Sequence, residues 1–282
     1  MRQRGDQIAW IGLAVLAAVA YGPVLLRLSA AWWSDAEYSH GLFCVPVAAA
    51  IVWWRRDELA RLRRVPSRAG LFGAGVAIAL LWLGTLGAEL FLTRASLLLF
   101  IASTVVYLFG WRHLRAMAFP LAIVALSIPI PAILMTHITL PLQFAASSAA
   151  ETTLAAIGIP VLREGNVLLL PDATLQVAEA CSGVRSMMSL LVIGVVVARI
   201  TDHHLLTRMA IVAAAIPVTI AVNAVRVTAT AVATEYYGVA AAQGVLHEAL
   251  GVILFFASAI LLVGCARLVA AMAPRLSVRM QS

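Results

Sequence analysis

Long apolar stretches, separated by short segments rich in arginine and other polar residues, dominate the pattern of this chain. Most of them approach the roughly 20 residues that a helix needs to cross about 30 Å of hydrocarbon. The pattern therefore predicts one all-α polytopic membrane domain over residues 1–282, with about eight transmembrane helices. The predicted spans are 8–28, 41–54, 70–89, 95–110, 114–134, 183–199, 208–232 and 246–266.

One long segment between the fifth and sixth spans, about residues 135–182, departs from this pattern. Its first part, 136–158, mixes apolar and polar residues and predicts an interfacial or re-entrant helix. Short β-prone runs follow, two of them flanking Gly165 and Asn166, and they predict a small hairpin at the membrane surface before the sixth span. This extracytoplasmic hairpin would lead directly into Cys181.

The composition supports a lipid surround rather than a soluble globule. The chain is 63% apolar and only 12% charged, whereas soluble domains are about half apolar and a quarter charged. The first apolar stretch follows Arg2 and Arg4 and has some features of a signal peptide. It is long for such a peptide and lacks a small-x-small cleavage site, so we expect it to be retained as the first helix.

The net charge of +7 comes from a chain whose twenty basic residues are all arginine. A nucleic-acid partner is not expected, because no basic run is interleaved with aromatic residues. With the N-terminus inside, fifteen arginines fall in inner segments, which predicts that both termini face the cytoplasm. The five outer arginines are Arg27, Arg94, Arg163, Arg185 and Arg226.

The first candidate for chemistry is the segment that enters the sixth helix, from Glu179 to Ser186. Ser182 suits the N-cap position, and Gly183 allows close backbone approach. Cys181 would meet free N–H groups and the positive end of the helix dipole, which favour a thiolate. Arg185 would add positive charge on the same face. The alternative is a small buried cysteine beside a helix cap.

Two further candidates lie in the seventh and eighth helices. Arg226 would lie about 9–13 Å from the outer end of its helix, where a guanidinium must find a partner inside the bundle. Asn223 shares its face, and the alternative role for the pair is snorkelling or a structural hydrogen bond. His247 begins the eighth helix and could exchange protons near neutral pH, or it could be an ordinary interfacial histidine.

Topology brings these candidates to one level of the membrane. The sixth helix is predicted to run inward, the seventh outward and the eighth inward. Cys181, Arg226 and His247 therefore all fall in the outer half of the bundle. A thiolate there could attack an amide carbonyl, with the histidine moving protons and the arginine stabilising the oxyanion.

A last candidate is the turn Tyr38-Ser39-His40-Gly41 in the first outer loop. An aromatic interface belt with a turn explains it, and substrate contacts through Tyr38, His40 and also Glu179 are the alternative. No metal or cofactor is expected, because one cysteine and one histidine without a spaced second pair do not form a zinc site. The chain also lacks nucleophile-elbow, zinc-protease and P-loop motifs.

Over about residues 30–265 the sequence resembles the exosortase/archaeosortase family of membrane transpeptidases. The resemblance rests on three blocks, with weaker support from the turn at 38–41 and from Arg163-Glu-Gly-Asn166. These blocks are Glu179-Ala-Cys181-Ser-Gly-Val-Arg185, Asn223-Ala-Val-Arg226-Val, and His247 with Gly251. The archaeal branch is expected to carry arginine at the third position, so His247 favours a bacterial exosortase.

The resemblance implies cleavage of C-terminal sorting signals of the PEP-CTERM type on exported, membrane-tethered proteins. Such a signal has a Pro-Glu-Pro-type motif, a transmembrane helix and a basic cluster. Cys181 would form a thioacyl intermediate that passes to an unknown acceptor, with Arg226 on the oxyanion side, His247 as acid and base, and Arg185 in support. The competing hypotheses are an anion or proton-coupled transporter that uses Arg226 and His247, and a non-catalytic scaffold for exopolysaccharide assembly.

Overall fold

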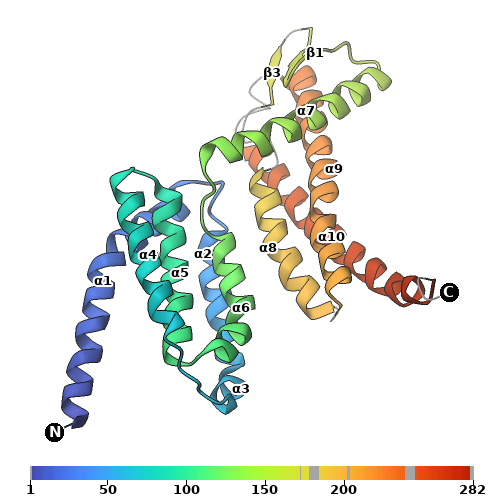
Figure 1. Ribbon diagram of the computed structural model, residues 1–282. Coiled ribbons are helices and arrows are strands. Elements are labelled where there is room, and N and C mark those ends of the chain that lie inside the picture. Colours follow the sequence, from blue (N-terminus) through green and yellow to red (C-terminus); the bar gives the residue numbers. More distant parts are fainter. Residues whose placement is uncertain (1, 172, 178–183, 202–203, 239–244, 280–282) are drawn as a thin grey trace. The chain divides into compact units, whose positions relative to one another are not determined.

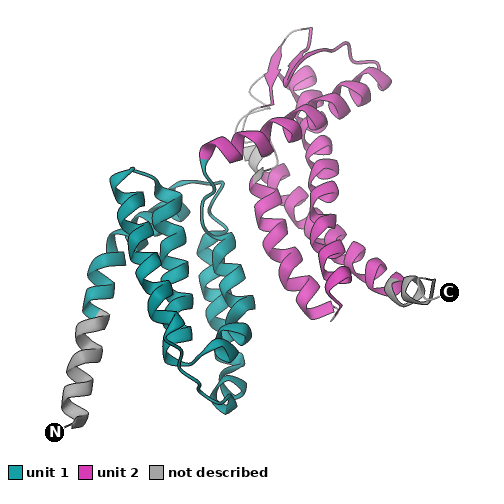
Figure 2. Ribbon diagram, viewed as in Figure 1, with its two compact units in different colours: residues 1–131 teal, residues 132–282 magenta. Residues whose placement is uncertain are grey.

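The computed structural model describes the backbone of residues 2–171, 173–177, 184–201, 204–238 and 245–279. Side chains of residues 2–14, 184, 245–248 and 273–279 lie outside this description. The chain divides into two compact units, Met1–Pro131 and Ala132–Ser282 (Figure 2). The single domain over residues 1–282 stays a prediction beside this division.

Unit 1 is helical throughout its described elements (Figure 1). The α4–α5 pair is the most tightly packed, because Gly70 lets α4 approach the backbone of Tyr107 and Ser103 on α5. Its helices are α1 (Arg2–Ser34), α2 (Gly41–Trp54), α3 (Arg56–Arg61), α4 (Ala69–Leu86), α5 (Leu90–Leu108) and α6 (Trp111–Leu126).

The C-terminal half of α1 packs on the α4–α5 pair through a small apolar cluster. Tyr21 and Val24 are buried against Leu81 of α4. The Tyr21 ring lies 5.0 Å from that of Phe100, centroid to centroid, and its hydroxyl donates to the Ser96 carbonyl at 3.4 Å. These contacts hold α1 beside the end of α4 that precedes the short turn into α5.

Unit 2 is built around α9, which contacts α7, α8 and α10. Figure 1 shows α7 lying across one end of α9, with the strands beside it. The elements are α7 (Ala132–Ala156), β1 (Leu162–Glu164), β2 (Val167–Leu169), β3 (Thr174–Gln176), α8 (Val184–Thr201), α9 (Leu205–Tyr237) and α10 (Val245–Arg279).

The three strands form one antiparallel sheet in the order β1-β2-β3. Glu164 pairs with Val167 across a two-residue turn, and Gly165 has a φ of 66°. A positive φ at the first turn residue alone fits a type II′ turn, which favours glycine at that position. Leu168 is fully buried in a core shared with α7 and α9. The β-prone runs of the sequence thus form a sheet packed on helices, and its extracytoplasmic location stays a prediction.

Five helices are long and apolar enough to cross a membrane among the described residues. They include Val15–Ser34 of α1, α4, α5, α9 and Ala249–Met272 of α10, and α2 is a shorter apolar helix. The all-α membrane fold is therefore supported, whereas the count of eight stays a prediction. The predicted span 114–134 ends too late, because α6 ends at Leu126 and prolines follow at 129 and 131.

Candidate active site

A row of polar residues runs along one side of α9, each three or four residues from the next, so that they share one face. Its members are Thr219, Asn223, Arg226, Thr230 and Thr234. The hydroxyl groups of Thr219 and Thr234 donate to the carbonyls of Ala215 and Thr230, each at 2.8 Å. These two threonines satisfy their donors within α9, whereas the long side chain of Arg226 reaches the neighbouring helix.

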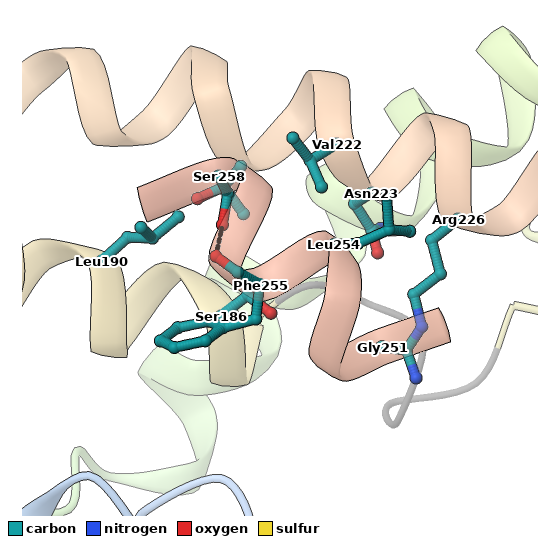
Figure 3. A pocket seen from close by; sticks show the side chains of 10 residues that line it. Ser186, Leu190, Val222, Asn223, Arg226, Gly251, Leu254, Phe255 and Ser258 are labelled. Atoms are coloured by element: carbon teal, nitrogen blue, oxygen red, sulfur yellow. Dashed lines mark hydrogen bonds between the residues drawn. The ribbon is translucent and has the colours of Figure 1, made fainter. Parts of the chain in front are cut away.

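Arg226 lies directly over Gly251 of α10, as Figure 3 shows. A Cβ atom at Gly251 would lie 3.2 Å from Nη2 and 3.4 Å from Cζ of Arg226. The Nε atom of the guanidinium is buried. Glycine at 251 therefore gives the guanidinium the space to lie against the α10 backbone, and the position of this charge depends on that missing side chain.

Three helices meet at a narrow crevice beside this guanidinium. Its volume of about 20 Å³ is enough for one water molecule or one polar atom of a ligand. Residues from α8, α9 and α10 line it: Ser186, Leu190, Thr219, Val222, Asn223, Arg226, Gly251, Leu254, Phe255 and Ser258. The crevice is thus a small polar site in an otherwise apolar helix bundle.

Asn223 brings an unused hydrogen-bond donor to the crevice. Its side chain is 6% exposed, and Nδ2 has no hydrogen-bond partner among the residues that the structure describes. The Ser258 hydroxyl, by contrast, donates to the Phe255 carbonyl at 2.6 Å, the bond drawn in Figure 3. A buried amide donor costs free energy unless it is used, so the crevice offers a free donor beside the cation.

A second feature fixes the chain just before the predicted nucleophile. Asn166 donates from Nδ2 to Gln143 Oε1 at 2.9 Å and to the Val177 carbonyl at 3.2 Å. The Val177 N–H in turn donates to the Asn166 carbonyl at 2.9 Å. Val177 is 1% exposed and lies four residues before Cys181. The last described residue of this segment is therefore held to α7 through a single asparagine.

The same turn is fastened to α7 by charge. Arg163 donates from Nε to Glu151 Oε2 at 2.8 Å and from Nη1 to the Gly165 carbonyl at 2.9 Å. The Ser147 hydroxyl donates to that carbonyl at 3.0 Å. The Arg163-Glu-Gly-Asn166 motif singled out in the sequence thus builds a turn whose side chains and carbonyls bind α7.

The predicted site residues of unit 2 differ in how far the structure describes them. Arg226 and Asn223 lie together in the crevice. Arg185 is exposed on α8 and is not among the crevice residues, although its neighbour Ser186 is. His247 belongs to α10, four residues before Gly251, and its side chain lies outside the described residues. The segment with Glu179, Cys181, Ser182 and Gly183 also lies outside them.

Tyr38 and His40 belong to unit 1, where they bind the C-terminal end of α6. His40 hydrogen-bonds the Leu126 carbonyl through Nε2 at 3.1 Å, and the Tyr38 hydroxyl donates to the Ile130 carbonyl at 3.5 Å. Trp32 donates from Nε1 to the Ser127 carbonyl at 2.8 Å. Burial raises the pKa of Tyr38, and the neighbouring carboxylates add to this effect. His40 and Trp32 satisfy carbonyls that the end of α6 leaves open, and Tyr38 binds the segment that follows α6. Tyr38 and His40 therefore both have a structural role.

Sequence inspection assigned no role to Ser186, the last residue of the segment that enters the sixth predicted helix, and it missed Ser258 on α10. A usable signal existed on α9, where polar residues recur at helical spacing inside an apolar helix. Isolated serines on apolar helices carry no such signal. No group of three or more His, Cys, Asp or Glu side chains suited to a metal occurs among the described residues, and the lack of a cofactor stays a prediction.

The chain was compared with models of protein families. The model of the transmembrane exosortase family matches residues 32–264, which runs through both compact units and includes the crevice. No curated protein and no solved structure matches the chain.

Proposed function

Because the chain belongs to the transmembrane exosortase family, with a role in protein sorting at the membrane, we propose that it is a cysteine transpeptidase. Its substrates would be exported proteins that carry a C-terminal sorting signal of the PEP-CTERM type. Cys181 would cleave this signal and transfer the protein to an acceptor whose identity is open.

The observation that carries this proposal is the close contact of the Arg226 guanidinium with Gly251. The guanidinium lies against α10 one helical turn after position 247, and residues one turn apart share a helix face. A cation fixed at this point suits the stabilisation of negative charge beside a group that moves protons. The free amide donor of Asn223 in the same crevice adds a second group for a developing oxyanion.

The proposed reaction has two stages. The Cys181 thiol gives its proton to His247, and the thiolate adds to the scissile carbonyl, whose oxygen becomes negative beside Arg226. The carbon–nitrogen bond then breaks, and His247 returns the proton to the leaving amine. In the second stage an acceptor nucleophile loses a proton to His247 and attacks the thioester, and the Cys181 thiol is regenerated.

The hydrogen bonds of Asn166 to Gln143 and to Val177, here called the clamp, support the same proposal. A nucleophile reacts efficiently only when its position relative to the substrate is fixed. Asn166 holds Val177 to α7, and only three residues separate Val177 from Cys181. Arg185, exposed at the start of α8, would add positive potential near the thiolate without touching the crevice. We further propose that the site faces outward, as the arginine count predicts, and that the membrane is the bacterial inner membrane, as the resemblance to bacterial exosortases implies.

The transporter hypothesis is less well supported by the crevice. A volume of about 20 Å³ accommodates about one water molecule, far less than a path for an anion. A non-catalytic scaffold would need neither the contact between Arg226 and Gly251 nor the unused amide donor of Asn223. The geometry around Arg226 therefore favours catalysis over both alternatives.

The direct test is Cys181→Ala in bacterial cells that export a reporter with a Pro-Glu-Pro-type motif, a transmembrane helix and a basic cluster. We expect full-length precursor to accumulate. Cys44→Ala and Cys265→Ala are matched controls, because both remove a free thiol elsewhere in the chain. Normal processing by Cys181→Ala, at protein levels equal to the controls, would refute the nucleophile.

A trapping experiment separates a nucleophilic cysteine from a structural one. Hydroxylamine cleaves thioesters, so it should release the reporter from the wild-type enzyme as a hydroxamate. His247→Ala and Arg226→Ala should yield less hydroxamate, since both would act before the thioester forms. A hydroxamate that forms equally with Cys181→Ala would contradict a thioacyl intermediate at this residue.

A further inference from the structure

Unit 1 contains a cavity that the proposed reaction does not use. It has a volume of about 380 Å³, within the range of small-ligand sites, and lies between α1, α4 and α5. Its lining is mainly apolar, but it includes two arginines, Arg27 of α1 and Arg94 of α5. A mainly apolar cavity with two cations suits a ligand that has an anionic group and an apolar part.

Arg94 is the strongest sign of a ligand. Arg94 is only 8% exposed, and it lines the cavity. Within the described part of the chain, neither Arg94 nor Arg27 forms a hydrogen bond or ion pair. The nearby carboxylate of Glu89 instead accepts the Leu92 N–H at 2.7 Å and caps α5. Glu89 and Tyr38 act on the Arg94 guanidinium through charge alone. A buried guanidinium without a hydrogen bond or ion pair is costly, and an anion in the cavity would reduce that cost.

The cavity has a buried floor and an exposed rim. Val24, Leu81 and Thr93 are buried beneath it. Trp82 is 64% exposed and Leu90 is 43% exposed at its edge, and both belong to helices apolar enough to span a membrane. Exposed apolar residues on such helices face lipid, so a ligand can enter sideways from the bilayer rather than from water.

The depth of the arginines also suits a lipid. Arg94 lies four residues after the start of α5, or about 6 Å along the helix axis. Arg27 lies seven residues before the end of α1, or about 10 Å along its axis. Both charges therefore lie near the same end of unit 1, at the depth where lipid headgroups meet acyl chains.

We propose that this cavity binds an anionic membrane lipid, with its phosphate between Arg27 and Arg94 and an acyl chain along Trp82 and Leu90. Trp82 provides the probe for the test. The full-length protein is reconstituted in phosphatidylcholine vesicles that contain either brominated phosphatidylglycerol or brominated phosphatidylcholine. Quenching of Trp82 is taken as the difference between the wild type and Trp82→Phe.

We expect brominated phosphatidylglycerol to be enriched about fivefold at Trp82 over brominated phosphatidylcholine, as one such charge contact would give. Arg94→Gln should remove this preference. Arg27→Gln tests the same contact at an exposed residue, where folding is not at stake. The matched control is Arg61→Gln, which removes an exposed arginine from α3, outside the cavity.

Two further arms separate this site from general attraction and from free anions. Ala20→Phe fills the cavity from α1 without changing charge, and it should abolish the preference. Excess inorganic phosphate should leave the quenching unchanged. Equal quenching by both lipids in the wild type, retention of the preference in both arginine variants, or displacement by phosphate would each overturn the proposal.

Discussion

Each unit of this chain has an arginine on a membrane-type helix that lines a cavity, and the two sites differ in how much space surrounds the charge. Arg226 in unit 2 lies on Gly251 beside a crevice of about 20 Å³ that contains polar groups of three helices. Arg94 in unit 1 lines a mainly apolar cavity of about 380 Å³. The first environment fixes a cation, and the second leaves room for a large ligand. The volume and the lining of the two cavities, rather than the presence of an arginine, separate the two proposed roles.

The largest effect is expected from removing the fixed cation. Arg226→Lys keeps a positive charge but loses the planar group that lies on Gly251, so we expect reporter processing to fall about 100-fold or more. Arg94→Lys is the paired variant, and we expect it to process the reporter much as the wild type does. If both variants lost reporter processing to the same extent at equal protein levels, the proposed difference in role between Arg226 and Arg94 would be wrong.

A smaller loss of reporter processing is expected when the space that Gly251 leaves for the Arg226 guanidinium is filled. A Cβ at Gly251 would lie 3.2 Å from Nη2, so Gly251→Ala forces the guanidinium to move by a few tenths of an ångström. We expect processing to fall about tenfold, since misplaced catalytic groups cost rate steeply.

Gly264→Ala is the control, because it makes the same change in α10 where a Cβ would meet nothing within 4 Å. Processing rates from a reporter time course would distinguish them. Equal rates for the two glycine variants would show that the position of Arg226 does not depend on Gly251.

The clamp before Cys181 should have an effect of intermediate size. Asn166→Ala removes two side-chain bonds, and Gln143→Ala removes one of them. Each loss should cost about 1 kcal/mol of stability, read from thermal unfolding in detergent. The double variant should lose less than the sum of the two single losses, because both residues share one bond. Full additivity would show that the Asn166–Gln143 bond contributes nothing.

The smallest effect is expected from the ion pair of the turn. Arg163 and Glu151 are each about a third exposed, so their pairing is screened by solvent. Glu151→Gln should cost less than about 1 kcal/mol, and the cost should shrink as salt is added. Thermal unfolding at two salt concentrations measures both quantities. A loss that does not respond to salt would indicate that the carboxylate is needed for packing rather than charge.

The sequence predicted the helical elements well because the thickness of the bilayer sets the length of the apolar runs. Arginines are concentrated in the loops between these runs, so they mark where the helices end. It failed at the end of the fifth span, where Ile128 and Ile130 are apolar but alternate with two prolines that end the helix. Among the site residues, Asn223 and Arg226 were identified because polar groups stand out in an apolar helix. The cavity around Arg94 was not, since it depends on how α1 packs against the α4–α5 pair, which lies far from α1 in the sequence.

The hydrogen bonds that fasten the first loop to α6 have a consequence for biogenesis. They join residues separated by 86 to 95 positions. Since the chain is made from its N-terminus onward, the loop at 38–41 leaves the ribosome long before the carbonyls it binds exist. Four helices must therefore be synthesised before α1 and α2 receive their final restraint. The N-terminal part of unit 1 therefore cannot reach its final structure until the C-terminal part has been synthesised. Nascent chains that stop before residue 126 lack the carbonyl acceptors that hold this loop.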